Sequence, residues 1–544
     1  MRTTLIRGGS IYDGSGDAPF PGDVLVGDGI IAAVARGGFP GSADVVMDAA
    51  GLAVAPGFID AHSHSEWIVP EKNHLQILKP FLLQGVTAFM GGNCGFSPFP
   101  VAEAVRETVL ENSRFLVNER FAFHWRDQGG FFRHLEENGV CLNVATLVGH
   151  GPLRTLIRGG RPGPLAAGER DRLARMLEEA FNGGAYGVSM GLAFVPGIFA
   201  DAAEIETVFA AVARAGRIVA VHGRTYSRIS PYFPDDVSGA PHNLLDLASF
   251  IDVAAKTGAK LHISHLLLKG SGTWDLWRDA IELFERANAD GVDVTFGVIP
   301  YHCGNTPITT LFPKWFLEDF AGNMARPDRV KRLEREVFDT ERAIGRTFSD
   351  LHLLWGVNPS LAPLEGKSFS RIAEEMGIAE IEACLYLARE SGGGAKVLTA
   401  AYSGREGDCP EPLERLLEHP LSLVEIDAVL TSPEGPRVPA SFGAFPKWLG
   451  HYCRERGLMS MEQGVRKLTG APADRFGLRN RGYLREGFAA DMVLFNPATI
   501  RDANSIADPA RPAVGVAAVL VNGGLVVANG AVRDPALRGR VLYP

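Results

Sequence analysis

The feature that most constrains this chain is a regular alternation of short apolar runs with longer helical stretches through its middle. Eight runs rich in β-branched residues occupy 57–62, 86–94, 142–150, 186–192, 217–222, 260–265, 292–301 and 422–427. Several segments between them, such as "ERDRLARMLEEAFNGG", end in glycine, as helix C-termini often do. Eight strands alternating with helices predict an α/β fold of the (β/α)8 TIM-barrel type.

Both ends of the chain have a different pattern, with short strands joined by glycine turns. Residues 1–53 include "DVLVGDGIIAAVARGG", and residues 476–544 include "ADMVLFNP" and "VLVNGGLVV". We therefore expect the two ends to form one small β-sandwich around a barrel of residues 54–475. The segment around 302–421 is too long for a single connection, so we expect it to carry inserted helices that cover the barrel mouth.

The composition limits the partners of the protein. The 544 residues carry 63 acidic and 54 basic side chains, a net charge of −9, which argues against nucleic acid or an anionic membrane as a partner. No apolar run reaches the ~18 residues of a membrane helix. The opening "MRTTLIRGGSIYDGSG" has no apolar signal core, which favours the cytoplasm. The six cysteines include no CxxC pair, so we expect no disulfide framework.

Side chains that can bind a metal lie at the ends of five of the eight runs. In a (β/α)8 barrel these C-terminal strand ends form the active-site face. The side chains are His62 and His64 of the first run, Cys94 of the second, His222 of the fifth, His265 of the sixth and Asp427 of the eighth. His62 and His64 are two residues apart, so both point the same way on an extended chain. Because the chain has only 14 histidines and six cysteines, chance explains this convergence poorly.

Imidazole and thiolate ligands suit zinc, and a thiolate can also bridge two metals. Zinc polarises a carbonyl oxygen and lowers the pKa of water to roughly 7. A carboxylate beside it can take the proton of water and pass it to the leaving group, and Asp427 lies where that group is needed. His150, at the end of the third run, is expected to line the pocket without binding metal. His262 is expected to face the opposite way from His265. The alternative for both His150 and His262 is a structural role, in which the imidazole is hydrogen-bonded within the protein and takes no part in the site.

Many stretches of the sequence follow one another in the order of a known family. They include "PGFIDAHSHS", "GVTAFMGGNCGFSPFP", "NVATLVGHGPLR", "GAYGVSMGLAFVPGIFAD", "VHGR", "ISHL", "DVTFGVIPY" and "FGAFPKWLGHY". The chain thus resembles the N-acyl-D-amino-acid deacylases (D-aminoacylases) of the amidohydrolase superfamily. The resemblance implies a zinc-dependent amide hydrolase. It assigns Cys94, His222 and His265 to a tightly held metal, and His62 and His64, sharing Cys94, to a second and weaker position.

The resemblance also bears on the general base. Asp427 follows Pro420 by seven residues, which is the family's spacing from its "HP" pair, although the turn reads "EIDA" and not "GSDG". We therefore expect Asp427 to act as general base and then as general acid toward the amine.

Several substrate-side positions depart from the family's pattern. Phe194 replaces a tyrosine in "GLAFVPG", and Lys269 lies two positions later than the family's lysine. Arg437 is near, but not aligned with, the arginine that holds the substrate carboxylate in the family. Tyr301 matches a substrate-side tyrosine. One glycine separates Arg224 from His222 in the sequence. Arg224 is expected either to enter the pocket or to form a salt bridge at the barrel rim.

Two long segments of this face, 103–126 and 225–242, are rich in aromatic residues. They suggest an apolar acyl or aryl pocket, with loop packing or a subunit contact as the alternative. The leading hypothesis is deacylation of N-acyl-D-amino acids or a related N-acyl compound. The alternatives are hydrolysis of another C–N bond, as in an N-substituted formamide or a cyclic amide, and a non-catalytic metal-stabilised barrel. A small-molecule substrate is expected, and a homo-oligomer is left open.

Overall fold

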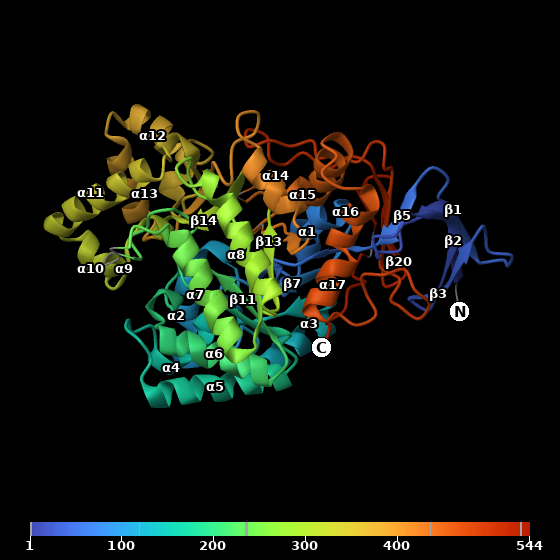
Figure 1. The fold of residues 1–544 in the computed structure, drawn as a ribbon, viewed down its shortest axis with the longest axis horizontal. Coiled ribbons are helices and arrows are strands. Elements are labelled where there is room, and N and C mark those ends of the chain that lie inside the picture. Colours follow the sequence, from blue (N-terminus) through green and yellow to red (C-terminus); the bar gives the residue numbers. More distant parts are fainter. Residues whose placement is uncertain (1–2, 119, 234–237, 428, 436, 534–535) are drawn as a thin grey trace.

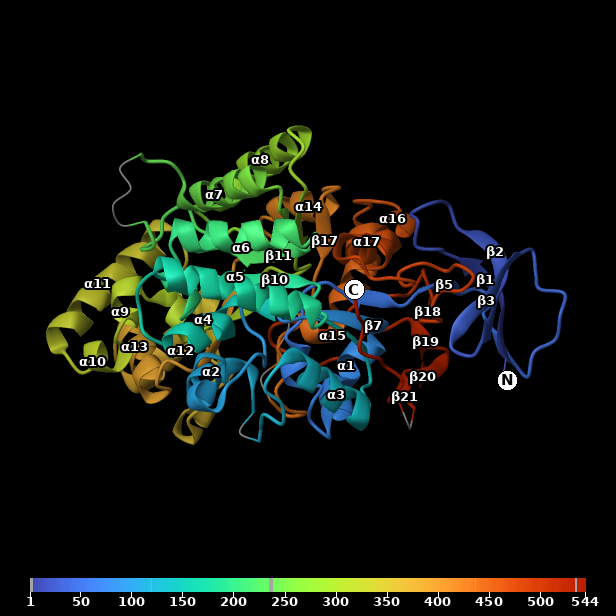
Figure 2. The same ribbon diagram turned by 90° about the horizontal axis from the view of Figure 1, so that it is seen from below.

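The computed structural model describes residues 3–118, 120–233, 238–427, 429–435, 437–533 and 536–544. A barrel of strands and helices occupies the middle of the molecule. Strands from the N-terminus lie at one end, and a lobe of helices α9 to α13 lies at the other (Figures 1 and 2).

The barrel strands follow one another as the sequence predicts. They are β6 (Phe58–Asp60), β7 (Val86–Gly91), β8 (Asn143–Thr146) with β9 (Val148–Gly149), β10 (Gly187–Gly191), β11 (Ile218–His222), β12 (Lys260–Ile263), β13 (Val294–Val298) and β17 (Ser422–Val424). They pair in parallel as β6-β7-β8 and as β9-β10-β11-β12-β13-β17, and only Leu147 separates β8 from β9. After β17, the backbone N–H of Asp427 donates to the carbonyl of His62 at 3.1 Å, which brings the first and last strand ends together.

Helices pack around these strands, and the burial explains the sequence pattern. They are α1 (His74–Leu83), α2 (Arg106–Asn112), α3 (Gln128–Asn138), α4 (His150–Arg158), α5 (Ala167–Asn182), α6 (Ala202–Arg214), α7 (His242–Thr257), α8 (Trp277–Ala289), α14 (Glu411–Glu418), α15 (Ala440–Lys447), α16 (Met461–Leu468) and α17 (Gly470–Phe476). Helix α5 buries Leu173, Leu177 and Phe181, which recur every four residues on one face. Every residue of β7, β10 and β11 is buried, because parallel strands are covered on both faces.

The two ends of the chain build one nine-stranded sheet. Its strands are β1 (Thr3–Ile11), β2 (Phe20–Gly27), β3 (Ile30–Arg36), β4 (Val45–Asp48), β5 (Ala53–Pro56), β18 (Met492–Phe495), β19 (Val516–Val521), β20 (Gly524–Ala528) and β21 (Ala531–Val532). Antiparallel pairing of β18 with β5 joins the two halves. Ile6 and Val24 share a buried core with Met492 and Leu520. The domain boundaries at 53/54 and 475/476 stay a prediction.

The segment between β13 and α14 forms a separate lobe. It contains β14 (Cys303–Pro307), β15 (Leu351–Trp355), β16 (Lys396–Ala400), α9 (Lys314–Leu317), α10 (Phe320–Met324), α11 (Pro327–Ala343), α12 (Phe369–Met376) and α13 (Glu380–Glu390). The lobe has its own apolar core, which includes Phe312, Leu333 and Leu353. Helices were expected here, but the antiparallel sheet β14-β16-β15 was not. The reason is local, because "CGNTP" of β14 has no apolar alternation.

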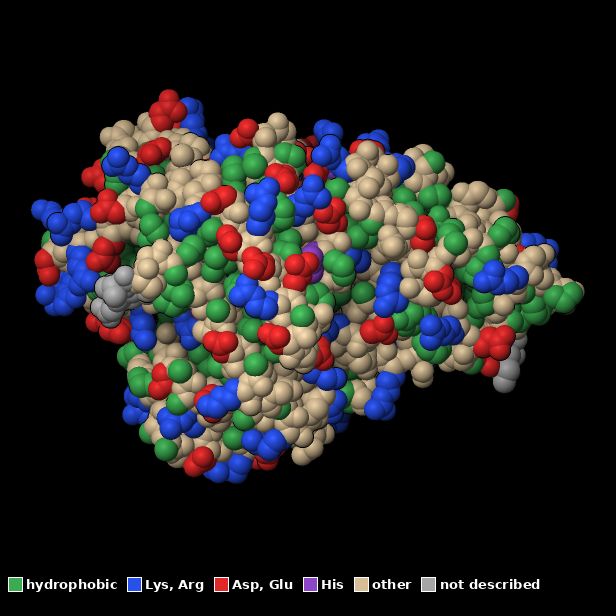
Figure 3. Space-filling model, viewed as in Figure 1, with side chains coloured by type: hydrophobic (Ala, Val, Ile, Leu, Met, Phe, Trp, Pro, Cys, Tyr) green, Lys and Arg blue, Asp and Glu red, His purple; other side chains and the backbone are tan. Residues whose placement is uncertain are grey.

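No helix in the described ranges is long and apolar enough to cross a membrane. On the face drawn in Figure 3, acidic and basic side chains are interspersed and do not gather into one patch.

Candidate metal centre

Five buried histidine and cysteine side chains meet at the C-terminal ends of the barrel strands. His62 and His64 follow β6, Cys94 follows β7, His222 ends β11 and His265 follows β12. The Cys94 Sγ lies 3.3 Å from His62 Nε2, 3.5 Å from His222 Nδ1 and 3.3 Å from His265 Nε2. Three sets of donor atoms lie within 4.8 Å of one another: His62, His64 and Cys94; Cys94, His222 and His265; and His62, His265 and Asp427. Cys94 therefore joins two overlapping ligand sets.

The backbone at these positions is unusual. Cys94, His265 and Asp427 have φ angles of 51°, 32° and 46°, in a region that side chains other than glycine seldom adopt. Such conformations cluster at functional sites, where the surrounding structure holds them. Next to Cys94, a Cβ atom at Gly95 would lie 2.6 Å from the backbone nitrogen of Gly191, so glycine is required there. The turn that presents the thiol thus depends on its glycine as well as on its cysteine.

The chemistry of this cluster fits a divalent cation. Burial lowers the pKa of His62 and His222 well below the ordinary value, and that of His265 to about 3, so all three are neutral. Neutral imidazole is the form that binds metal. Burial raises the pKa of the Cys94 thiol well above its usual value, and a cation at the cluster would favour the thiolate. Nitrogen and sulfur donors in this number suit zinc.

Asp427 lies beside the two histidines of the first strand end. Its Oδ1 is 3.4 Å from His62 Nε2 and 3.7 Å from His64 Nε2. Burial raises the pKa of this carboxyl well above its ordinary value, and the neighbouring carboxyls of Glu425 and Asp60 raise it further. A bound cation would act in the opposite direction and restore the carboxylate. The geometry therefore places a proton acceptor directly at the candidate ligands.

Sequence reasoning missed one buried carboxyl, Glu425. It is 2.8 Å from His262 Nε2 through Oε1, while Oε2 accepts the backbone N–H of His265 at 3.0 Å and lies 3.8 Å from His62 Nδ1. Burial raises its pKa to about 8. A Cβ at Gly297 would lie about 2.0 Å from this carboxylate, so glycine leaves room for it. The signal was present, because Glu425 is where "EIDA" departs from "GSDG".

The candidate ligands open onto a small cavity. It is lined by His64, Cys94, Phe115, Phe194, His222, Tyr226, His265, Leu267, Lys269, Asn305, Thr306, Pro307, Tyr402, Asp427 and Val429. The free space measures about 30 Å³, room for two or three water molecules at roughly 10–15 Å³ each. Phe194 and Lys269 were expected here, and burial lowers the pKa of Lys269 to about 7. Tyr226 and Asn305 were not anticipated; Asn305 Nδ2 donates to the backbone oxygen of Asp427 at 3.3 Å.

Three other predicted substrate residues lie outside this lining. His150 is fully buried at the start of α4, with its Nε2 2.7 Å from Glu204 Oε1. This contact agrees with the alternative of a structural, hydrogen-bonded histidine. Arg224 forms the rim salt bridge, with Nη1 2.6 Å from Asp246 Oδ1. The Tyr301 hydroxyl donates to Asp502 Oδ2 at 2.9 Å, so it is directed to the C-terminal segment.

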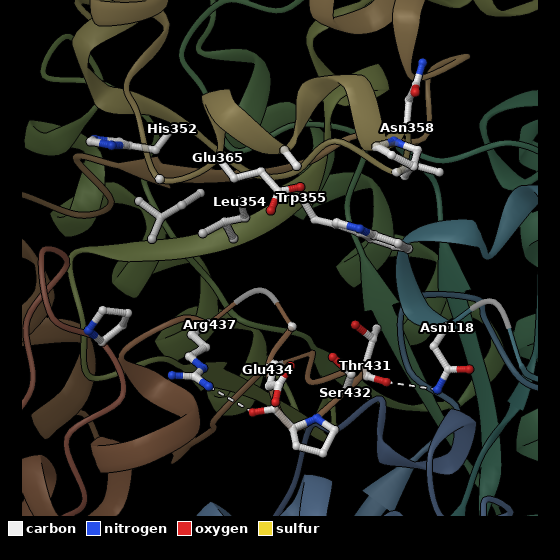
Figure 4. A pocket seen from close by; sticks show the side chains of 18 of the residues that line it. Asn118, His352, Leu354, Trp355, Asn358, Glu365, Thr431, Ser432, Glu434 and Arg437 are labelled. Atoms are coloured by element: carbon white, nitrogen blue, oxygen red, sulfur yellow. Dashed lines mark hydrogen bonds between the residues drawn. The ribbon is translucent and has the colours of Figure 1, made fainter.

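Arg437 also lies elsewhere, in a separate cavity of about 1030 Å³ (Figure 4). Its Nη2 donates to the backbone oxygen of Pro433 at 2.9 Å, within its own loop. The opposite wall carries His352, Leu354 and Trp355 of β15. This cavity shares no lining residue with the metal cavity among the described residues.

With this geometry established, comparison with known proteins defines the class. Residues 45–307 and 395–527 match the model of the amidohydrolase family, and the chain belongs to that family. The N-acyl-D-aspartate deacylase of Alcaligenes xylosoxydans xylosoxydans is 29% identical over 521 residues, which cover 95% of this chain and 91% of that protein. The N-acyl-D-glutamate deacylase of the same organism is 29% identical over 525 residues, covering 95% and 92%.

Solved structures agree with the sequence relatives. The N-acyl-D-glutamate deacylase of Bordetella bronchiseptica, in complex with zinc and a phosphonate mimic of the tetrahedral intermediate, has a TM-score of 0.80 and 28% identity, with 99% of each chain covered. A D-aminoacylase studied for its binuclear metal centre has a TM-score of 0.81 and 25% identity, also over 99% of each chain. The predicted resemblance to D-aminoacylases and the barrel fold with its added sandwich are thereby confirmed.

Proposed function

We propose that the protein is a zinc-dependent amidohydrolase that cleaves a linear amide bond, and that N-acyl-D-amino acids or related N-acyl compounds are its substrates. The observation that carries this proposal is the cluster of Cys94, four histidines and Asp427 beside one small cavity. Deacylase relatives that align over 95% of the chain support the substrate class.

Two overlapping sets of side chains would hold the metal. Cys94, His222 and His265 would hold the tightly bound ion, and His62 and His64 with Cys94 would hold a second, weaker one. Zinc, when bound, supplies a Lewis acid that polarises a carbonyl oxygen and makes water acidic near neutral pH.

The remaining chemistry falls to this chain's own side chains. Asp427 takes a proton from the attacking water and later donates it to the leaving amine. Its place 3.4 Å from His62 Nε2 keeps the carboxylate at the reacting centre. Lys269 is the only lysine or arginine among the described residues that line the cavity, so it is the cation available to a negative group of the substrate.

A second candidate function follows from the place of Arg437. A substrate carboxylate is best held by a bidentate arginine, and Arg437 faces a different cavity. Hydrolysis of an amide without a carboxylate, such as an N-substituted formamide or a cyclic amide, is therefore the alternative.

One experiment separates these functions. The zinc-loaded protein is offered N-acetyl-D-amino acids, their L enantiomers, uncharged linear amides and cyclic amides, and amine release or ring opening is measured. Preference for the N-acetyl-D-amino acids supports the leading proposal. Preference for uncharged or cyclic amides supports the alternative, and no turnover of any compound contradicts both.

We further propose a cytoplasmic protein acting on a small molecule, and its net charge of −9 argues against nucleic acid or an anionic membrane as a partner. Cell fractionation tests the location. Size-exclusion chromatography with light scattering tests the homo-oligomer left open by the sequence.

A further inference from the structure

The metal cavity is too small for an amide substrate. Its volume of about 30 Å³ holds only about two or three water molecules. A second cavity, of about 760 Å³, lies next to it, and Phe115, Phe194 and Pro307 line both. The cavity around Arg437 has no such shared residue within the described parts of the chain. The continuation of the substrate site is therefore the 760 Å³ cavity.

Aromatic rings separate the two spaces. Phe96 packs against Phe115 and Phe194 with ring centroids 5.2 and 5.3 Å apart. The Phe194 ring lies 4.4 Å from the ring of His222, so it reaches the candidate ligands themselves. The family pattern has a tyrosine at this position, whereas Phe194 has no hydroxyl, so the rings between the two cavities are apolar here. A group that leaves the metal centre in this direction first meets the apolar side chains of Phe115, Phe194 and Pro307, which line both cavities.

The far wall of this second cavity comes from the inserted lobe. Leu317, Phe320 and Met324 line it from α9 and α10, and the glycine turn 392–394 after α13 closes it. Glu111, Arg114 and Arg389 also line it, and all three are exposed, which keeps charge at the outer rim. The region 308–394 lies between the two segments that match the amidohydrolase family model. The wall therefore belongs to the part of the chain outside the shared catalytic scaffold.

The position of Asp427 shows which part of the substrate faces this cavity. Asp427 contacts the candidate ligands at His62 and His64, whereas Phe194 contacts them at His222. Because Asp427 donates the proton to the leaving amine, the amine lies on the Asp427 side. The acyl group then lies on the side of Phe194.

We propose that the 760 Å³ cavity binds a long apolar acyl chain, so that the substrates are N-acyl amides of medium- or long-chain fatty acids. This inference rests on the proposed amide hydrolysis and names its acyl specificity. Each buried methylene strengthens binding by about fourfold. We expect kcat/KM to rise by roughly two- to fourfold per methylene until the chain fills the cavity. Octanoyl, with six more methylenes than acetyl, should then exceed it by about sixtyfold or more.

The test is an acyl series from acetyl to dodecanoyl on one amine that the zinc-loaded enzyme accepts, with kcat/KM measured for each. A parallel series keeps the acyl group as acetyl and lengthens an alkyl chain on the amine. A preference that grows with the acyl chain supports the proposal. A flat or falling acyl series, or a preference that grows only with the amine chain, overturns it while leaving amide hydrolysis intact. No turnover at any length overturns the proposed function, and the inference with it.

Variants locate the chain in the cavity. Leu317→Trp fills the cavity from α9, and we expect the ratio of octanoyl to acetyl kcat/KM to fall by at least about tenfold. Leu311→Trp is the matched control, because both leucines are 8% exposed in the same apolar core and Leu311 lines neither cavity. If Leu317→Trp does not fold, Ala321→Trp, from an exposed position on the same wall, replaces it.

A binding measurement gives a readout apart from catalysis. Decanoate, the acid that an N-decanoyl amide would release, is titrated calorimetrically into the metal-free protein. We expect binding that Leu317→Trp weakens and Leu311→Trp does not. Equal decanoate affinity in the wild type and in Leu317→Trp, or no binding at all, contradicts the proposal.

Discussion

The barrel mouth and the inserted lobe differ in what they contribute to the same site. At the mouth, the side chains of His62, His222 and His265, from three strand ends, lie within 3.5 Å of Cys94 Sγ. In the lobe, Leu317, Phe320 and Met324 leave open space bounded by apolar surface. The first region lies within the amidohydrolase match, and the second lies outside it. The comparison indicates that the reaction is fixed on the shared strands and that substrate choice is set by an added wall.

The strongest way to break this comparison is to remove the shared ligand. Cys94→Ala is expected to lose bound zinc and amidase activity together, because Cys94 belongs to both ligand sets. Metal analysis and amine release measure the two losses. Cys141→Ala is the matched control, since Cys141 is equally buried but lies outside the cluster. An active, zinc-free Cys94→Ala protein would show that the reaction does not depend on this cluster.

The next largest effect is expected from Asp427→Asn. Loss of the proton acceptor should lower kcat by about 10²–10⁴-fold while zinc remains bound, because the amide keeps the shape of the side chain. Steady-state kinetics and zinc content together distinguish this from loss of the metal. A variant with unchanged kcat would assign the proton transfer to another group.

A smaller effect, on zinc affinity, is expected from the carboxyl that orients the candidate ligands at the barrel mouth. Glu425 contacts His262 and the backbone of His265, so Glu425→Gln should weaken zinc binding by about 10–100-fold, as loss of a carboxylate that orients ligands does elsewhere. Competition with a chromogenic chelator gives the zinc dissociation constant. The same affinity in both proteins would restrict Glu425 to a packing role.

The smallest effect concerns stability in the lobe. Lys396 of β16 is fully buried, its Nζ has no hydrogen-bond partner among the described residues, and burial lowers its pKa from 10.5 to about 7. The unfolded chain therefore binds more protons than the folded one between about pH 7 and 10.5, so stability rises with pH across that window.

Replacing Lys396 tests whether this side chain causes the predicted rise of stability with pH. Lys396→Met should raise the free energy of unfolding at pH 7 by about 1–3 kcal/mol and flatten its rise toward pH 10. Urea denaturation at several pH values measures both changes. A pH profile that is identical in the two proteins would mean that Lys396 keeps its ordinary pKa.

The sequence predicted the barrel and the cluster for one physical reason. The C-terminal ends of the parallel barrel strands meet at one face of the barrel. Polar residues at the ends of apolar runs can therefore be predicted to lie close together even when side-chain packing is not known. That rule identified Cys94, His222 and His265 together. Tyr301 and Arg437 were expected in the pocket from the family resemblance. Both lie outside its lining, because position in the sequence does not fix the direction of a side chain on a loop.

Two further features could not be derived from pattern alone. Glu425 lies directly after β17, two residues before Asp427, and reaches the cluster only because Gly297 on β13 leaves room for it. The sheet of β14, β15 and β16 is formed by strands far apart in the sequence, from Cys303 to Ala400, with little apolar alternation. In both cases the cause is a contact between distant segments, which local periodicity does not encode.

The most direct test of the account is a measurement of amidase activity against zinc content in one preparation. The protein is stripped with a chelator, dialysed, and titrated with zinc while turnover of the best amide substrate is followed. The account predicts no turnover without metal and recovery as the first equivalent of zinc binds. Full turnover by protein shown to be free of metal would contradict it.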